Sequence, residues 1–202
     1  MGGVEEMNVT FDPVKHQYWL GEKELPSVTK VLRACWPLKK SFEAADPAVI
    51  ENARERGVEV DTLLSRYAVG ELSAIPAGTR TDAVELFLKA KGWIDAALKA
   101  GSIQSQVILS DGNIAGMCDF IVAGPVIVDL KATYDIEAMY PVQLGLYALL
   151  YEEQFKQVVE GLGILHVTKR FDRPKWIPLD ADECKRDARL ILDTWKMAHR
   201  RS

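Results

Sequence analysis

The stretch GMCDFIVAGPVIVDLKA, Gly116–Ala132, carries the pattern that decides the fold. The run 126–128 is apolar and β-branched, which is typical of a buried strand. It leads directly into Asp129 and Lys131, and the apolar run before it contains Asp119. Two neighbouring strands that should be buried therefore carry two carboxylates and an ammonium group.

The length of the connection within 123–125 decides whether the two aspartates share a face of the sheet. A two-residue loop would pair Asp119 with Leu130 and point the two carboxylates to opposite faces. A three-residue loop would pair Asp119 with Asp129 and bring their Cβ atoms to about 4.5–5.5 Å. Because side chains alternate along a strand, Lys131 would then lie on the same face. The sequence alone leaves both registers open.

Two carboxylates at that distance repel each other, which raises one pKa unless a cation lies between them. A divalent metal ion would resolve the conflict, and an all-oxygen donor set favours Mg²⁺ or Mn²⁺ over zinc. We expect Asp119, Asp129 and the backbone carbonyl of Leu130 to be the ligands. Lys131 would then stabilise an anion or orient a water, an arrangement that suits phosphate-ester hydrolysis. The plain alternative is a surface ion pair between Asp129 and Lys131, with Asp119 exposed.

The composition is that of an ordinary globular domain, with 48% hydrophobic and 27% charged residues in a chain of 202. The formal net charge of -4 neither indicates nor excludes a nucleic-acid partner, because binding depends on where the charge lies. The three cysteines lack CxxC spacing, which argues against an iron–sulfur cluster, a zinc site and a disulfide scaffold. No stretch reaches the roughly 18 apolar residues of a membrane span. We therefore expect a cytoplasmic protein with no membrane partner.

The order of the remaining elements predicts an α/β fold, with a mixed central sheet flanked by helices on both faces and an N-terminal β-hairpin. The expected strands are 9–11, 17–20, 103–109, 114–122, 126–130, 163–169 and 175–179. The expected helices are 28–35, 47–69, 82–100, 141–159 and 181–199, the fourth ended by Gly161. The second of these helices has an apolar stripe at helical spacing, formed by Val49, Ala53, Val60, Leu64 and Tyr67. Gly57 falls on this stripe, where close packing would account for a glycine.

Gln143 and Tyr147 lie four residues apart on the helix that follows these strands, so they share one helical face. Both side chains can donate hydrogen bonds to phosphate oxygens, and a tyrosine ring can stack on a base. The alternative is that Tyr147 belongs to the core and Gln143 is solvated.

Three spaced motifs together resemble the active-site series of the PD-(D/E)XK nuclease superfamily, and more narrowly its RecB-type branch, which includes phage exonucleases. They are G-x-x-D at 116–119, D-x-K at 129–131 and Q-x-x-x-Y at 143–147. The resemblance implies a restriction-endonuclease-like core in which the two acidic residues hold metal. It also implies that Lys131 assists the attacking water and that the helix carrying Gln143 and Tyr147 contacts DNA.

The chain departs from that pattern at two positions. Members of this branch often carry a histidine four residues after the glycine of an RG pair, and Asp61 stands there in this sequence. Aspartate can also ligate a hard cation, so Asp61 is an additional candidate ligand. Gln106 stands where an acidic residue is common one strand earlier, and an uncharged amide would hold a second metal weakly. The four cysteines that bind an iron–sulfur cluster in some family members are not present.

The resemblance implies a Mg²⁺- or Mn²⁺-dependent deoxyribonuclease, with exonuclease action favoured over endonuclease action. Its partner would be DNA, with a recombination or single-strand-binding protein as a further candidate, in phage or bacterial recombination, repair or processing. A phage-encoded enzyme would act in the cytoplasm of the bacterial host. The alternative is a nuclease-fold module that binds DNA or protein without catalysis. We expect one domain, 1–202, with four parts: hairpin 1–26, helical part 27–101, catalytic sheet and helix 102–180, and C-terminal helix 181–202.

Overall fold

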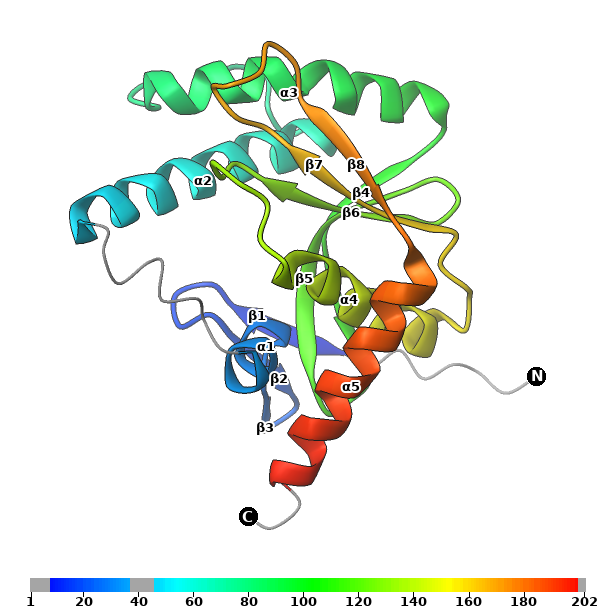
Figure 1. Ribbon diagram of the computed structural model, residues 1–202. Helices are drawn as coiled ribbons and strands as arrows, with labels where there is room; N and C mark the ends of the chain where they lie inside the picture. Colours follow the sequence, from blue (N-terminus) through cyan, green and yellow to red (C-terminus); the bar gives the residue numbers. More distant parts are fainter. Residues whose placement is uncertain (1–7, 37–45, 200–202) are drawn as a thin grey trace.

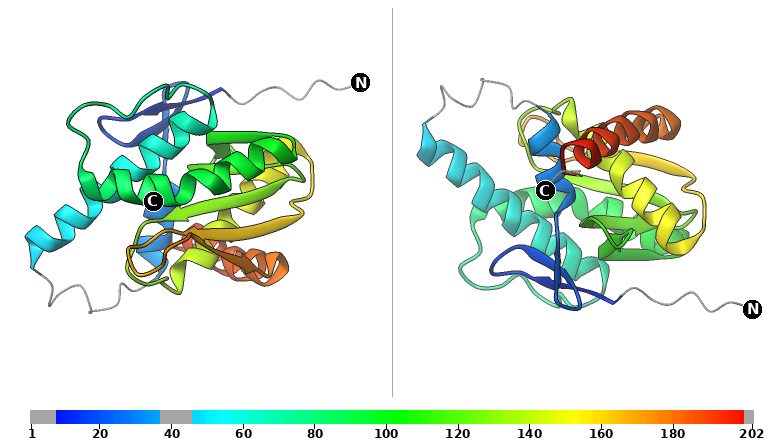
Figure 2. Two further views of the ribbon diagram at one scale, coloured as in Figure 1. Left: turned by 90° about the horizontal axis from the view of Figure 1, so that it is seen from above. Right: turned by 90° about the horizontal axis from the view of Figure 1, so that it is seen from below.

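The computed structural model describes residues 8–36 and 46–199, which form three layers (Figures 1 and 2). Helices α2 (Pro47–Ala68) and α3 (Thr81–Ala100) cover one face of a central sheet, and α1 (Val28–Cys35), α4 (Met139–Phe155) and α5 (Ala181–His199) cover the other. This confirms the expected mixed sheet with helices on both faces. None of the described helices is long and apolar enough to cross a membrane.

The central sheet has five strands in the order β4-β5-β6-β7-β8. The strands are β4 (Ile103–Ser110), β5 (Ala115–Val122), β6 (Val126–Lys131), β7 (Gly161–His166) and β8 (Lys175–Leu179). Neighbouring strands are antiparallel except β6 and β7, which are parallel. A parallel pair needs a crossover, and α4 supplies it between β6 and β7.

The register between β5 and β6 answers the question raised by the sequence. The connection is the three-residue loop 123–125, and the last pair of the ladder is Phe120 with Val128. The next pair in this register would be Asp119 with Asp129. The two-residue alternative, which separates the carboxylates onto opposite faces, is thus wrong. Beyond Phe120 and Val128, β5 and β6 no longer pair with each other, while β6 continues to pair with β7 as far as Lys131.

A small N-terminal sheet packs against the ends of β4 and β5. Its strands are β1 (Val9–Asp12), β2 (Gln17–Leu20) and β3 (Lys23–Leu25), in antiparallel order. The first two confirm the expected hairpin, and β3 is an addition that the sequence reading missed. Tyr18 and Leu25 are buried against Ala115 of β5. Ser27 then caps α1, its side chain accepting a hydrogen bond from the Lys30 N–H.

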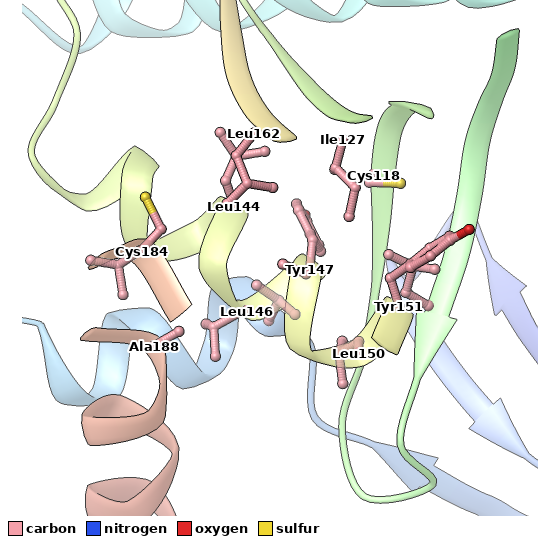
Figure 3. Close-up of a cluster of buried hydrophobic side chains, with 14 of the residues drawn as sticks. Cys118, Ile127, Leu144, Leu146, Tyr147, Leu150, Tyr151, Leu162, Cys184 and Ala188 are labelled. Carbon is pink, nitrogen blue, oxygen red and sulfur yellow. The ribbon is translucent and has the colours of Figure 1, made fainter. Parts of the chain in front are cut away.

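The two faces of the sheet have separate hydrophobic cores. On the α2–α3 face, Phe120, Val128 and Leu130 pack against the two helices. On the other face α4 is central, and Figure 3 shows its leucines and tyrosines among side chains from the sheet and α5. Gly145 permits the close approach of α4 to α5, since a Cβ there would clash with the Cys184 carbonyl oxygen. Because both faces are covered, a charged residue in the middle of the sheet is buried.

Three local predictions were wrong. The N-terminal half of α2 extends beyond the sheet (Figure 1), so Val49 and Ala53 are exposed and the buried stripe begins only at Val60. No neighbouring atom lies within 4 Å of a Cβ built on Gly57, so close packing does not account for that glycine. Helix α4 ends at Phe155, because Lys156 adopts a left-handed conformation; the expected terminator, Gly161, instead begins β7.

Candidate active site

The candidate site lies where β5 and β6 part. The Leu130 N–H, which would otherwise pair with β5, donates a hydrogen bond of 2.6 Å to Asp119 Oδ2. The carbonyl of Lys131, one residue on, accepts from the Val167 N–H on the β7 side at 2.9 Å. Successive residues of a strand direct their main-chain groups to opposite edges, so the Leu130 carbonyl also faces the β5 side. Asp119 and the Leu130 carbonyl, both predicted as ligands, thus face the same opening.

Asp129 and Lys131 lie on β6 at the same opening. The Lys131 Nζ is 2.6 Å from Asp129 Oδ2 in a buried ion pair. It also donates a hydrogen bond of 3.4 Å to Gln143 Oε1 on α4, and it lies 4.6 Å from the ring centroid of Tyr140. The ammonium group is therefore fixed from three directions. The alternative of a surface ion pair is wrong, because Asp129 is only 3% exposed.

Helix α2 brings a third carboxylate to this cluster. The Gln106 Nε2 on β4 donates to both carboxylate oxygens of Asp61, at 3.2 and 3.0 Å, and to Ser65 Oγ at 3.0 Å. The Ser65 hydroxyl also contacts Asp61 at 3.4 Å. Gln106 has a left-handed backbone conformation, with φ of 55°. That conformation interrupts the β4–β5 ladder at the position opposite Asp119.

The electrostatics show that the three carboxylates act on one another. Burial raises the pKa of Asp61 to about 6, a rise that its bonds from Ser65 and Gln106 oppose and the charge of Asp129 adds to. Burial, then Asp61 and Asp129, hold the pKa of Asp119 well above its usual range. Burial also raises the pKa of Asp129, although Lys131 opposes it. Burial alone would lower the pKa of Lys131, but Asp129 and Asp119 outweigh it and the pKa rises.

The donor set fits a hard divalent cation. Three carboxylates face one ammonium group, so their ionised forms leave two negative charges in a largely buried space, where charge is costly without a partner. All the candidate ligand atoms are oxygens, which suit Mg²⁺ or Mn²⁺. Among the described residues, no group of three or more His, Cys, Asp or Glu side chains has the arrangement of a ready-made metal site. Asp129 is directed to Lys131 and Asp61 to Gln106.

Gly116 has a packing role in the G-x-x-D motif. A Cβ at this position would lie 2.7 Å from Cε1 of Tyr147 and 2.8 Å from Cγ2 of Val28. The glycine thus lets α4 and α1 approach β5 just before Asp119. The ring of Tyr147 is buried within the core (Figure 3), and its hydroxyl accepts a hydrogen bond of 3.2 Å from Gln143 Nε2. Contact of this pair with DNA, which stays a prediction, would therefore rest on Gln143, whose side chain is partly exposed.

The structure brings the predicted site residues together where β5 and β6 part, and it adds two more. Ser65 lies four residues after Asp61, so helical spacing could have identified it. Tyr140 lies three residues before Gln143 on the same helical face and covers Lys131. His166 is buried and bonded to the Thr133 carbonyl at 2.8 Å, in a structural role.

Comparison with known proteins gives only distant structural likenesses. No protein-family model matches the chain, and no curated protein matches it. The fold is similar to SSO0001 at 15% identity, covering 88% of this chain and 79% of the other, with a TM-score of 0.41. The phage-related exonuclease from Haemophilus somnus 129PT is 12% identical, with 86% of this chain and 92% of the other covered and a TM-score of 0.41. The alkaline exonuclease LHK-Exo from Laribacter hongkongensis is 10% identical, with 86% of this chain and 89% of the other covered and a TM-score of 0.39. At these values function has to be inferred from the site itself.

Proposed function

We propose that the protein is a metal-dependent nuclease that hydrolyses phosphodiester bonds of DNA. The observation that carries this proposal is the meeting of Asp61, Asp119 and Asp129 with Lys131 where β5 and β6 part. A structural ion pair would need one carboxylate and one ammonium group, whereas this cluster holds two further carboxylates. Such an excess of buried negative charge is typical of a functional site.

The residues that would hold the cation are Asp119, Asp129 and the Leu130 carbonyl, with Asp61 as a further ligand. Mg²⁺ or Mn²⁺ bound there would offset the negative charge that develops on the phosphate and lower the pKa of the attacking water. The protein's own residues position the ligands and exclude water. The hydrogen bond from Leu130 holds Asp119 at the opening, and the covered faces of the sheet exclude bulk water from Asp129, which strengthens every charge interaction there.

Lys131 would act on the reacting phosphate or on the water that attacks it. Its ammonium group carries a positive charge at neutral pH, because Asp129 and Asp119 raise its pKa. Gln143 and Tyr140 restrict its position. Attack by water on phosphorus breaks one P–O bond and leaves a phosphate monoester and a hydroxyl end. A fixed ammonium group that donates to a non-bridging oxygen stabilises the transition state without reorganising.

A binding module without catalysis is the second candidate, and one observation favours it. Both oxygens of Asp61 are already bonded to Gln106, and Gln106 itself brings no charge. If this clamp persisted, Asp61 would not be free to ligate. The protein would then hold DNA or a protein partner on a nuclease-like fold. Binding of Mn²⁺ would favour the nuclease, and absence of binding would favour the module.

The finer proposal, an exonuclease that processes DNA ends in phage or bacterial recombination or repair, rests on the motif resemblance. The test is incubation of end-labelled linear and closed circular DNA, single- and double-stranded, with and without Mg²⁺. Digestion of linear DNA alone supports an exonuclease, and digestion of circles shows an endonuclease. Asp129→Ala should abolish cleavage without unfolding, while Asp193→Asn, at an exposed position of α5, should have no effect. Full Mg²⁺-dependent cleavage by Asp129→Ala would contradict the proposal.

A further inference from the structure

A cavity lies beside the candidate active site. It has a volume of about 170 Å³ and lies between α2, α3 and the loops that follow β6 and β7. Its lining includes three basic side chains, a threonine, a tyrosine and a leucine: Arg56, Lys169, Arg170, Thr168, Tyr134 and Leu86. None of the described residues that line it carries a carboxylate. A small cavity with this lining has the chemistry of an anion site.

The acidic residues near the cavity only partly neutralise two of these basic side chains. Arg56 Nη1 is 3.8 Å from Asp82, a carboxylate that Arg80 already holds at 3.1 Å. Lys169 Nζ is 4.0 Å from Glu85. Glu85 in turn is closer to Lys89, at 3.2 Å. Both partners are therefore shared with a nearer cation.

Arg170 differs from the other two, since it forms an ion pair with Asp135 at 3.2 Å. Both side chains of that pair are largely exposed, so it is worth little and is easily exchanged. Arg170 also lies 4.4 Å from the ring centroid of Tyr134, which is 68% exposed. An exposed aromatic ring stacked with arginine is a surface on which a base can stack.

Arg56 carries a second, independent sign of a missing ligand. Its Nε is buried, yet it has no hydrogen-bond partner among the described residues. Buried donors of this kind are rare in folded proteins, because an unpaired polar group costs free energy. A guanidinium group that lines a cavity, and whose Nε has no hydrogen-bond partner among the described residues, is well suited to a phosphate oxygen.

The cavity is close enough to the carboxylates for one strand of nucleic acid to reach both. Residues 132–134 follow Lys131 directly, and all three of them line the cavity. Arg56 lies five residues before Asp61 on α2, a rise of about 7.5 Å. Phosphates of one strand recur about every 3.4 Å along a duplex axis. A phosphate one or two nucleotides from the scissile bond would thus fall near the cavity.

We infer that this cavity binds a phosphate group of the DNA strand whose phosphodiester lies at Lys131. The inference rests on the proposed function for its substrate. Arg56 and Lys169 supply the charge, and Tyr134 with Arg170 supplies a stacking surface. The phosphate is either an internal one or the terminal phosphate of an end, and the chemistry of the cavity serves both.

The test is DNA binding without divalent metal, measured by fluorescence anisotropy in EDTA over a range of salt concentrations. The double variant Arg56→Gln/Lys169→Gln should weaken binding by about tenfold, and the slope of log affinity against log salt should fall by about 1 for each lost contact. The matched control is Arg54→Gln/Arg186→Gln, which removes two positive charges from side chains 67% and 66% exposed. It should change affinity less than twofold.

Three labelled substrates distinguish the source of the phosphate: a 5′-phosphorylated strand, its dephosphorylated form and a circular single strand. Equal weakening on all three assigns the cavity to internal phosphates, and weakening confined to the phosphorylated strand assigns it to the end. Equal losses in the double variant and the control would overturn the inference, as would no loss on any substrate. If Arg56→Gln unfolds the protein, Lys169→Gln alone applies the same test, because Lys169 is 52% exposed.

Calorimetric titration with Mn²⁺ tests the proposed function independently of the phosphate site. The double variant should bind Mn²⁺ as the unmodified protein does, because Arg56 and Lys169 contact none of the three carboxylates. If the unmodified protein fails to bind Mn²⁺ but the double substitution still weakens DNA binding, the proposed metal-dependent activity is contradicted and the phosphate site is supported. Loss of Mn²⁺ binding in the double variant would contradict a separate phosphate site.

Discussion

The Leu130 N–H donates a hydrogen bond to Asp119 Oδ2 across the gap between β5 and β6, at 2.6 Å. A carboxylate thus replaces a carbonyl of the neighbouring strand at the point where the ladder ends. The bond holds Asp119 beside Asp129, and both carboxylates lie largely out of water. The arrangement costs free energy unless a cation is bound, and the predictions below follow from that cost.

Replacement of Lys131 by methionine should lower the rate of Mg²⁺-dependent cleavage by about 10²–10³-fold, because a positioned donor to the phosphate or water is lost. Binding of Mn²⁺ should persist, since the carboxylates remain. Single-turnover cleavage and calorimetry measure the two effects. The control is Lys156→Met, which removes an exposed lysine that pairs with Glu153. An unchanged cleavage rate in Lys131→Met would rule out its catalytic role.

The metal-free protein should lose stability as the pH rises from about 4 to about 7. The pKa of Asp61 is raised to about 6 in the folded state, so the folded protein binds more protons than the unfolded chain over this range. The stabilisation is complete below the usual pKa of 3.8 and is lost as the pH passes through 6. Its size is about 2–3 kcal/mol. Thermal unfolding in EDTA should show this slope, and Asp61→Asn should flatten it; equal slopes in both proteins would contradict the assignment.

Gly116→Ala should destabilise the protein by about 1–3 kcal/mol, because its Cβ would overlap Tyr147 and Val28. Gly57→Ala is the matched control: it lies inside α2, with open space around its Cβ. Alanine there should stabilise the helix by about 0.5–1 kcal/mol. Denaturant unfolding measures both. If the two variants shifted stability in the same direction, the packing role of Gly116 would be wrong.

Gln106→Glu should tighten Mn²⁺ binding by about tenfold, because a fourth carboxylate joins the cluster beside Asp61. The same change should lower the unfolding temperature of the metal-free protein through repulsion. Gln104→Glu is the control on the same strand, since it introduces the same charge at an exposed position. Unaltered Mn²⁺ affinity in a folded Gln106→Glu protein would show that this position lies outside the metal site.

The sequence predicted the sheet, the long helices and the cluster around Asp119 and Asp129, because these depend on local periodicity and on spacing along one chain segment. It could not choose between the two registers, which differ by one residue in the loop 123–125. Nor could periodicity show that α2 extends beyond the sheet, leaving Val49 exposed, since burial depends on where the sheet ends.

Contacts between distant segments were also out of reach of the sequence. The clamp of Gln106 on Asp61 joins β4 to α2 over 45 residues, and the left-handed conformation of Gln106 has no signal in its residue type. The end of α4 was misplaced because Lys156, a residue that seldom adopts a left-handed conformation, ends the helix in place of a glycine.

The most direct test of the shared cation site is calorimetric titration of the protein with Mn²⁺ at pH 7.5, beside Asp119→Asn and the exposed-site control Asp193→Asn. We predict micromolar binding by the protein and by Asp193→Asn, and its loss in Asp119→Asn with the fold retained by circular dichroism. Failure of the unmodified protein to bind Mn²⁺, or equal binding by Asp119→Asn, would contradict a cation held between these strands.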